Sequence, residues 1–256
     1  MNDSNGLLFR ISGKNIAKLN LETTCPVCFK IEAYLESQPP IMKKKIPFSM
    51  GFPGVFSEFD SHIKNSVKDH FVKNGSVPAW FPNLGKKIID IIPAPGWQNF
   101  NAINHEYKLY LTGAIDAIFK LEDGSHVIAD YKTAMITDTQ DMLFPLYSAQ
   151  LHLYKYIAEF RNLYRPINSL VLIYCEPISS ATLNIDNYKD GFIERLFIDF
   201  RLVVKQITID DGLVKELFIK LRKILDTKGL APLENCPNCQ LRERLFLQEK
   251  LLKNLV

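Results

Sequence analysis

Apolar residues recur along the middle of the chain in short runs that favour strands and are separated by turn residues. The segments Gly113–Leu121 and Val127–Lys132 are both rich in β-branched and apolar residues. Asp123-Gly124 lies between them and is a strong hairpin-turn signal. The pattern predicts two antiparallel strands in which residues at similar distances from the turn lie opposite one another.

The rest of the chain alternates between helical and extended patterns. Helices are expected where apolar residues recur at helical spacing, at 58–71, 145–160, 210–226 and in the last stretch to residue 256. Strands are expected at 104–111, 168–176, 181–185 and 193–204, with a further apolar run at 88–92. This order favours an α/β fold in which a mixed central sheet is flanked by helices.

Two acids and a lysine occupy matching places on the predicted hairpin. Asp116 lies seven residues before Asp123, and Asp130 lies six residues after Gly124, so the two acids should be neighbours. Asp130 and Lys132 are two apart and share one face of their strand. Buried acids need a partner, and Mg²⁺ binds one or two carboxylates while keeping several waters. A nearby lysine can orient a water or stabilise developing negative charge. The pattern predicts a metal site for phosphate chemistry; a chance Asp-x-Lys on an exposed hairpin is the alternative.

The hairpin and the helix after it carry three further motifs, Gly113-x-x-Asp116, Asp130-Tyr131-Lys132-Thr133 and Gln150-x-x-x-Tyr154. Together these motifs resemble the PD-(D/E)XK nuclease superfamily. The Gln-x-x-x-Tyr helix points to its RecB-type branch, which includes the RecB and AddB nuclease domains and the CRISPR-adaptation exonucleases. The resemblance implies a restriction-endonuclease-like core and a metal-dependent DNA nuclease covering most of the chain.

The resemblance also implies roles for the matching residues. Asp116 and Asp130 would ligate Mg²⁺ or Mn²⁺, with the backbone carbonyl of Tyr131 as a further ligand. Lys132 would position or activate the attacking water. The glutamine and tyrosine of the helix motif would orient the DNA strand or the lysine. Apart from the resemblance, the polar composition of residues 133–144 predicts a loop over the site that would control access to it.

RecB-type domains often carry a metal-binding histidine, or an acidic replacement, on a helix before the hairpin. Asp60 and His62 on the predicted helix 58–71 are the candidates. Asp60 is favoured because a carboxylate suits Mg²⁺, whereas His62 keeps the residue type without the family's spacing. The alternative is that both are ordinary polar residues on the helix surface.

Four of the five cysteines form two Cys-Pro-x-Cys pairs, Cys25/Cys28 and Cys236/Cys239, and the inner two, Cys28 and Cys236, are 208 positions apart. In a cytoplasmic chain this spacing favours a metal over disulfides. Both a tetrahedral zinc site and an iron–sulfur cluster remain open. Some RecB-type nucleases join their ends with a [4Fe–4S] cluster, but on one cysteine before and three after the core. In either case the site would be structural, and Cys175 should be a buried apolar residue.

The length and the net charge of the chain add little to the predicted fold and function. The 256 residues suffice for a single domain, with a core at about 55–205 whose two ends are joined by the cysteine site. A net charge of +3 does not by itself predict nucleic-acid binding, so DNA contacts need local clusters such as Lys43–Lys45. No apolar run approaches the roughly 18 residues of a membrane helix, and the polar start has no signal-peptide pattern. We expect a cytoplasmic protein that does not enter a membrane.

The sequence thus predicts a nuclease for single-stranded DNA or duplex ends, in DNA repair, recombination or defence. A helicase or a CRISPR-adaptation protein is a candidate partner. Two alternatives remain open. One is a catalytically silent nucleic-acid-binding module of the same fold; the other is a zinc-knuckle interaction protein whose acids are incidental.

Overall fold

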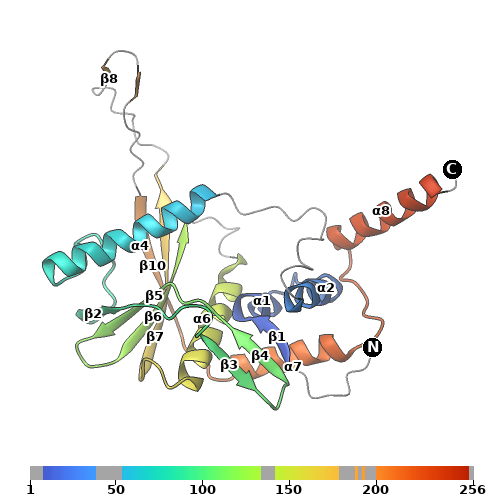
Figure 1. The fold of residues 1–256 in the computed structure, drawn as a ribbon, viewed down its shortest axis with the longest axis horizontal. Helices are drawn as coiled ribbons and strands as arrows, with labels where there is room; N and C mark the ends of the chain where they lie inside the picture. The colour runs from blue at the N-terminus through green and yellow to red at the C-terminus, as the bar shows by residue number, and fades with distance from the viewer. Residues whose placement is uncertain are drawn as a thin grey trace.

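The computed structural model describes residues 8–38, 54–133, 142–178, 188–189, 192–193 and 200–253. A mixed five-stranded sheet lies at its centre, in the order β10-β7-β6-β5-β2 (Figure 1). The strands are β2 Ile88–Ile92, β5 Ala117–Leu121, β6 His126–Thr133, β7 Ile167–Pro177 and β10 Phe200–Ile207. β6 and β7 are parallel, and the other neighbours are antiparallel.

Two helices cover this sheet, one on each face. α4, Gly54–Asn74, and α6, Phe144–Phe160, belong to separate hydrophobic clusters. Val127 and Ala129 of β6 pack in the cluster with α4, whereas Ile128 between them packs in the cluster with α6. Because both faces of β6 are covered, its apolar residues form a continuous run. The predicted mixed sheet flanked by helices is confirmed.

A second, three-stranded sheet has the order β1-β4-β3. It consists of β1 Phe9–Ser12, β3 Asn101–Asn104 and β4 Leu109–Thr112, with β1 parallel to β4. The single strand predicted at 104–111 is wrong, because the chain reverses there. The Asn104 side chain accepts a 2.9 Å hydrogen bond from the Tyr107 backbone N–H, and Lys108 has a φ of 50°. Both features are typical of a turn.

The remaining helices bring the two ends of the chain together. They are α1 Gly13–Ala17, the 3₁₀ helix η1 Lys18–Asn20, α2 Pro26–Ser37, α7 Leu213–Asp226 and α8 Pro237–Lys253. α1 and α7 both contact α6, and α2 contacts α7 and α8. α8 extends away from the body of the molecule (Figure 1). A short ribbon pairs β8, Tyr188–Lys189, with β9, Phe192–Ile193.

Most predicted elements agree with the structure to within a few residues. The expected helices at 58–71, 145–160 and 210–226 correspond to α4, α6 and α7, and the strand at 168–176 corresponds to β7. The strand expected at 193–204 begins later, because β10 starts at Phe200. The strand at 181–185, the basic run 43–45 and residues 134–141 of the predicted access loop lie outside the described residues. The core boundaries of 55–205 remain a prediction.

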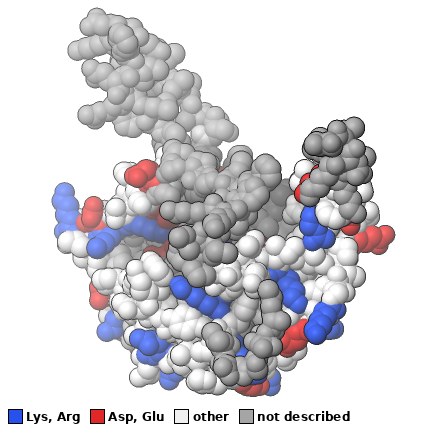
Figure 2. All heavy atoms as spheres, turned by 45° about the vertical axis from the view of Figure 1, so that its right-hand side comes forward, with Lys and Arg blue, Asp and Glu red and all other residues white. Residues whose placement is uncertain are grey.

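The surface carries mixed charge. On the face in Figure 2, described lysines and arginines are spread among acidic residues rather than gathered in one patch. No helix in the described part of the chain combines the length and apolar character needed to cross a membrane.

Candidate active site

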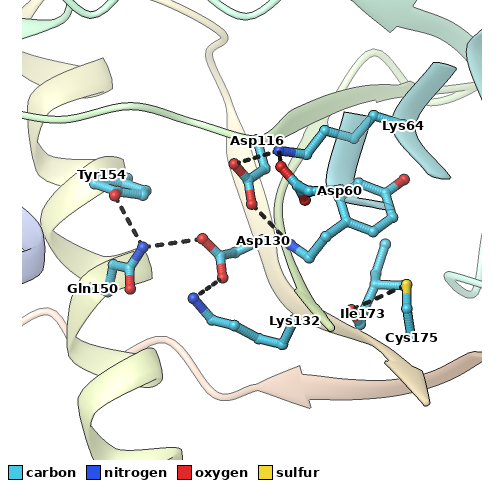
Figure 3. Close-up of polar contacts among 10 residues, drawn as sticks. Asp60, Lys64, Asp116, Asp130, Lys132, Gln150, Tyr154, Ile173 and Cys175 are labelled. Atoms are coloured by element: carbon cyan, nitrogen blue, oxygen red, sulfur yellow. Dashed lines mark hydrogen bonds and ion pairs between the residues drawn. The ribbon is translucent and has the colours of Figure 1, made fainter. Parts of the chain in front are cut away.

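Asp116 lies at the entrance to β5, opposite Asp130 of β6. The pairing of Ala117 with Ala129 continues the register that the Asp123-Gly124 turn predicted. Asp116 Oδ2 accepts a 3.0 Å hydrogen bond from the Tyr131 backbone N–H, which fixes the carboxylate at the end of the hairpin (Figure 3). Its other oxygen, Oδ1, lies 2.8 Å from the Nζ of Lys64 on α4.

Asp130 is a buried acid with two partners, and only 3% of its surface is exposed. Its Oδ1 accepts a 3.0 Å hydrogen bond from Gln150 Nε2, and its Oδ2 lies 2.5 Å from Lys132 Nζ (Figure 3). Burial raises the pKa of Asp130 to about 6, the charge of Lys132 opposes this shift, and the charge of Asp116 adds to it. The folded protein therefore disfavours the ionised form of Asp130, which a cation would relieve.

Gln150 is held in place from the other side by Tyr154. Gln150 Nε2 donates to Tyr154 Oη at 2.9 Å as well as to Asp130, so both of its amide hydrogens are used. Tyr154 is itself buried. Gln150 Oε1 is buried and accepts no hydrogen bond within the described residues. A buried oxygen without a donor, on a side chain that contacts a buried acid, fits a site that takes a hydrated cation.

Gly113 explains why the motif begins with glycine. A β-carbon at this position would lie 3.0 Å from ring atoms of both Phe100 and Tyr154. Real Cβ atoms rarely come this close, so a side chain would push the two rings apart. Gly13 also packs against Tyr154, with an imagined β-carbon 3.4 Å from the ring. The two glycines let the backbone close around the tyrosine that holds Gln150.

Lys132 has a second partner that the sequence did not reveal. Its Nζ lies 4.4 Å from the centre of the Tyr147 ring, within the range of a cation–π interaction. Tyr147 lies on α6, three residues before Gln150, so both project from the same side of the helix. That spacing is a signal that could have identified Tyr147 from the sequence.

The structure places the two helix candidates differently. Asp60 Oδ2 lies 2.5 Å from Lys64 Nζ and is thereby linked to Asp116 (Figure 3). His62 instead lines a separate cavity of about 590 Å³ with Trp80 and other residues. The structure therefore brings Asp60, but not His62, to the hairpin acids. Lys64 was missed, although its spacing of four residues from Asp60 indicates a helical ion pair.

The four paired cysteines meet in a second cluster. Their sulfur atoms all lie within 4.8 Å of one another, with Cys28 Sγ 3.6 Å from Cys236 Sγ and 3.5 Å from Cys239 Sγ. One tetrahedral ion with metal–sulfur bonds of about 2.3 Å would separate its sulfurs by about 3.8 Å. A cubane cluster holds its thiolates farther apart, because each thiolate binds a different iron. The spacing fits a single ion.

The local structure around these cysteines also suits thiolates. Each pair lies at the start of a helix, α2 or α8, where free backbone N–H groups favour negative charge. Burial opposes ionisation of Cys25, but hydrogen bonds from the backbone of Cys28 and Leu233 and from the neighbouring thiols lower its pKa to about 6. Burial and the neighbouring thiols raise the pKa of Cys28 and Cys239, so the cluster without an ion favours one thiolate rather than four. The fifth cysteine, Cys175, is fully buried in the core as predicted.

Comparison with known proteins gives the family. A sequence model of the PD-(D/E)XK nuclease superfamily matches residues 70–244, about two thirds of the chain. The chain therefore belongs to the PD-(D/E)XK nuclease superfamily. The match includes the hairpin and the α6 helix that carry Asp116, Asp130, Lys132 and Gln150.

Two solved structures show a distant likeness. The crystal structure of SSO0001 is 12% identical, covers 89% of this chain and 80% of its own, and has a TM-score of 0.40. The alkaline exonuclease LHK-Exo from Laribacter hongkongensis is 9% identical, covers 97% of this chain and 96% of its own, and also has a TM-score of 0.40. Both are too distant to transfer an activity to this chain. No curated protein matches the sequence.

Proposed function

We propose that this protein is a divalent-metal-dependent DNA nuclease that hydrolyses phosphodiester bonds. The observation that carries the proposal is the surrounding of Asp130, a buried acid whose oxygens meet Lys132 at 2.5 Å and Gln150 at 3.0 Å. Asp116 faces it across the hairpin. Asp130 and Lys132 form an ion pair on β6, and Asp116 lies opposite Asp130 in the hairpin register, which supports metal-assisted phosphate chemistry at this end of the sheet.

Each residue has a role that follows from its contacts. Asp116 and Asp130 would hold Mg²⁺ or Mn²⁺, with the Tyr131 carbonyl and Asp60 as further ligands. A bound divalent ion would supply charge at the phosphate and favour ionisation of a water. Lys132 is held between Asp130 and the Tyr147 ring, so its ammonium is directed to orient the attacking water.

A cleavage assay tests the function. End-labelled linear and circular DNA, single- and double-stranded, is incubated with Mg²⁺, Mn²⁺ or EDTA. We expect metal-dependent cleavage that Asp116→Asn and Lys132→Met abolish while the unfolding temperature stays close to that of the wild type. Metal-independent cleavage, or full activity of both variants, would refute the assignment. DNA binding without cleavage would favour the silent module instead.

We also propose that the cysteine cluster holds one structural zinc ion. The sulfur separations of 3.5–3.7 Å support a single tetrahedral ion over a [4Fe–4S] cluster. Elemental analysis and the visible spectrum of anaerobically purified protein decide between them. One zinc per chain without visible absorption is expected. A broad band near ~400 nm together with bound iron would establish a cluster instead.

The finer assignments are proposals as well. The contact of Gln150 with both Asp130 and Tyr154 gives the Gln-x-x-x-Tyr pattern a physical role and supports membership of the RecB-type branch. DNA repair, recombination or defence, with a helicase or a CRISPR-adaptation partner, would follow from that branch. The cytoplasmic location remains a prediction from the sequence.

A further inference from the structure

Lys64 of α4 is shared by two carboxylates of the candidate site. Its Nζ lies 2.8 Å from Asp116 Oδ1 and 2.5 Å from Asp60 Oδ2 (Figure 3). Its side chain is only 25% exposed. Asp60 and Asp116 come from different elements, α4 and the entrance to β5, so the ammonium group joins the helix to the hairpin.

The ammonium group is well suited to this position. The Nζ of Lys64 is within 2.8 Å of one carboxylate oxygen each from Asp60 and Asp116, and two acids at this distance favour the charged form of a lysine. It neutralises two acids that would otherwise repel one another across the gap between α4 and the hairpin.

The same acids do not form a metal site as they stand. Within the described residues, the four cysteines are the one group of three or more metal-ligating side chains close enough to hold an ion. Asp60, Asp116 and Asp130 do not form such a group, and a cation already lies between the first two. A divalent ion that binds both Asp60 and Asp116 therefore has to take the place of the Lys64 ammonium.

We propose that Lys64 is a place-holding cation: its ammonium occupies the position between Asp60 and Asp116 in the metal-free protein, and a divalent ion displaces it. This inference rests on the proposed metal-dependent nuclease. It makes Lys64 a positioning residue, which keeps the acids together until the ion arrives and weakens ion binding because the ion must compete with it.

The displaced side chain has space beside the site. A cavity of about 220 Å³ lies next to Asp116, and its lining includes Lys64 and Lys68 of α4 and Ile91 of β2. A released Lys64 ammonium in this cavity would lie close to the bound ion and to Lys68.

The test is calcium binding to the full-length protein after dialysis against metal-free buffer, measured by calorimetry. Ca²⁺ is a hard ion that takes the same oxygen ligands. Lys64→Met removes the charge and keeps the length of the side chain; Lys68→Met is the matched control on the same cavity. We expect Lys64→Met to bind Ca²⁺ roughly 5- to 30-fold more tightly than the wild type, because no ammonium competes. Lys68→Met should stay within about twofold, because a solvent-exposed charge acts weakly.

A stability measurement gives a second readout. Without calcium, Lys64→Met should unfold at a lower temperature than the wild type, because Asp60 and Asp116 are no longer neutralised. Saturating calcium should restore most of the loss, whereas Lys68→Met should change little in either condition. If Lys64→Met does not fold without calcium, Lys64→Gln, which still donates hydrogen bonds, replaces it in both measurements.

The outcomes separate this inference from the proposed function. The proposed function and this inference both fail if the wild type cleaves no DNA and shows no Ca²⁺ binding that depends on Asp116, as judged by its loss in Asp116→Asn. If the wild type binds Ca²⁺ through Asp116 but Lys64→Met binds it equally or more weakly, only the place-holding role is overturned. An equal increase of Ca²⁺ affinity in Lys64→Met and Lys68→Met would also overturn the place-holding role. The loss of any nearby positive charge would then explain both results.

Discussion

Gln150 and Asp130 are joined by a hydrogen bond of 3.0 Å that spans from α6 to β6. Because Gln150 uses its second amide hydrogen on Tyr154, the amide cannot rotate without losing both contacts. One oxygen of Asp130 is therefore committed to the helix, and the other is directed to Lys132. The orientation of Asp130 on β6 is therefore set by a residue of α6.

Removal of the Gln150–Asp130 hydrogen bond should slow the chemical step more than it weakens substrate binding. We expect Gln150→Ala to lower kcat by about 10- to 100-fold with little change in KM, because Asp130 loses its fixed orientation. The assay is steady-state cleavage of a labelled DNA substrate with Mg²⁺. Gln206→Ala, on the exposed side of β10, is the control and should behave as the wild type. Equal kcat values for both variants would contradict the role of Gln150.

Tyr147 should contribute to activity through the cation–π contact of its ring with Lys132, and not through its hydroxyl group. Tyr147→Phe keeps a ring 4.4 Å from Lys132 Nζ and is expected to retain most of the activity. Tyr147→Leu removes it and should lower kcat by about 3- to 10-fold, consistent with a cation–π interaction of about 0.5–2 kcal/mol. Single-turnover cleavage rates measure this difference. A Tyr147→Phe variant as slow as Tyr147→Leu would show that the hydroxyl group is the active part.

The raised pKa of Asp130 predicts a pH-dependent gain of stability in Asp130→Asn. Above about pH 6 the wild type carries the cost of an ionised, buried carboxylate, which asparagine lacks. Metal-free Asp130→Asn should therefore be more stable by about 1–3 kcal/mol near neutral pH. Denaturant unfolding measures this gain in stability. The gain should shrink as the pH falls from about 6 towards 3.8, because Asp130 then becomes protonated in the folded and in the unfolded wild type. A gain that grows at low pH would contradict the sign of the shift.

Gly113 should tolerate no side chain. Gly113→Ala places a β-carbon 3.0 Å from the rings of Phe100 and Tyr154, so we expect a loss of about 1–3 kcal/mol in unfolding free energy. The rate of cleavage should fall as well, because Tyr154 holds Gln150. Gly96→Ala is the control: its nearest neighbour is the flexible end of Gln98, and the change should be within about 0.5 kcal/mol. Similar losses at the two positions would contradict the close packing at Gly113.

The cysteine cluster should lose its ion when one ligand is removed. Cys239→Ser is expected to reduce the bound metal from one ion per chain to a small fraction and to lower the unfolding temperature. The metal content is measured by elemental analysis after gel filtration. Cys175→Ala is the control for thiol number, because Cys175 lies in the sheet core and should leave the metal content unchanged. Unchanged metal in Cys239→Ser would contradict a four-sulfur site.

The local part of the site could be predicted from the sequence, because it depends on one turn. Asp123-Gly124 fixes the register of β5 and β6, and the register alone places Asp116 opposite Asp130. The strand predicted at 104–111 was wrong for a local reason as well. The side chain of Asn104 caps a turn there, and its hydrogen bond to the Tyr107 backbone was not recognised in the sequence.

The contributions of α4 and α6 depend on how each helix is rotated against the sheet. A sequence shows which residues share a helix face, but not which face meets the hairpin. Asp60 and His62 are two apart and so project in nearly opposite directions; the apolar residues of α4 that pack on the sheet decide between them. Lys64 and Tyr147 were missed for the same reason, since each matters only through a partner on another element.

The spacing of the cysteines has a consequence for biosynthesis. Cys25 and Cys28 leave the ribosome early, but their partners Cys236 and Cys239 follow only after some two hundred further residues. The hairpin and α6 are complete well before that point, so the part of the chain that carries the candidate site can fold while translation continues. Acquisition of the proposed structural ion would then be a late maturation step, and until that step a nascent chain would expose two unliganded thiols at the start of α2.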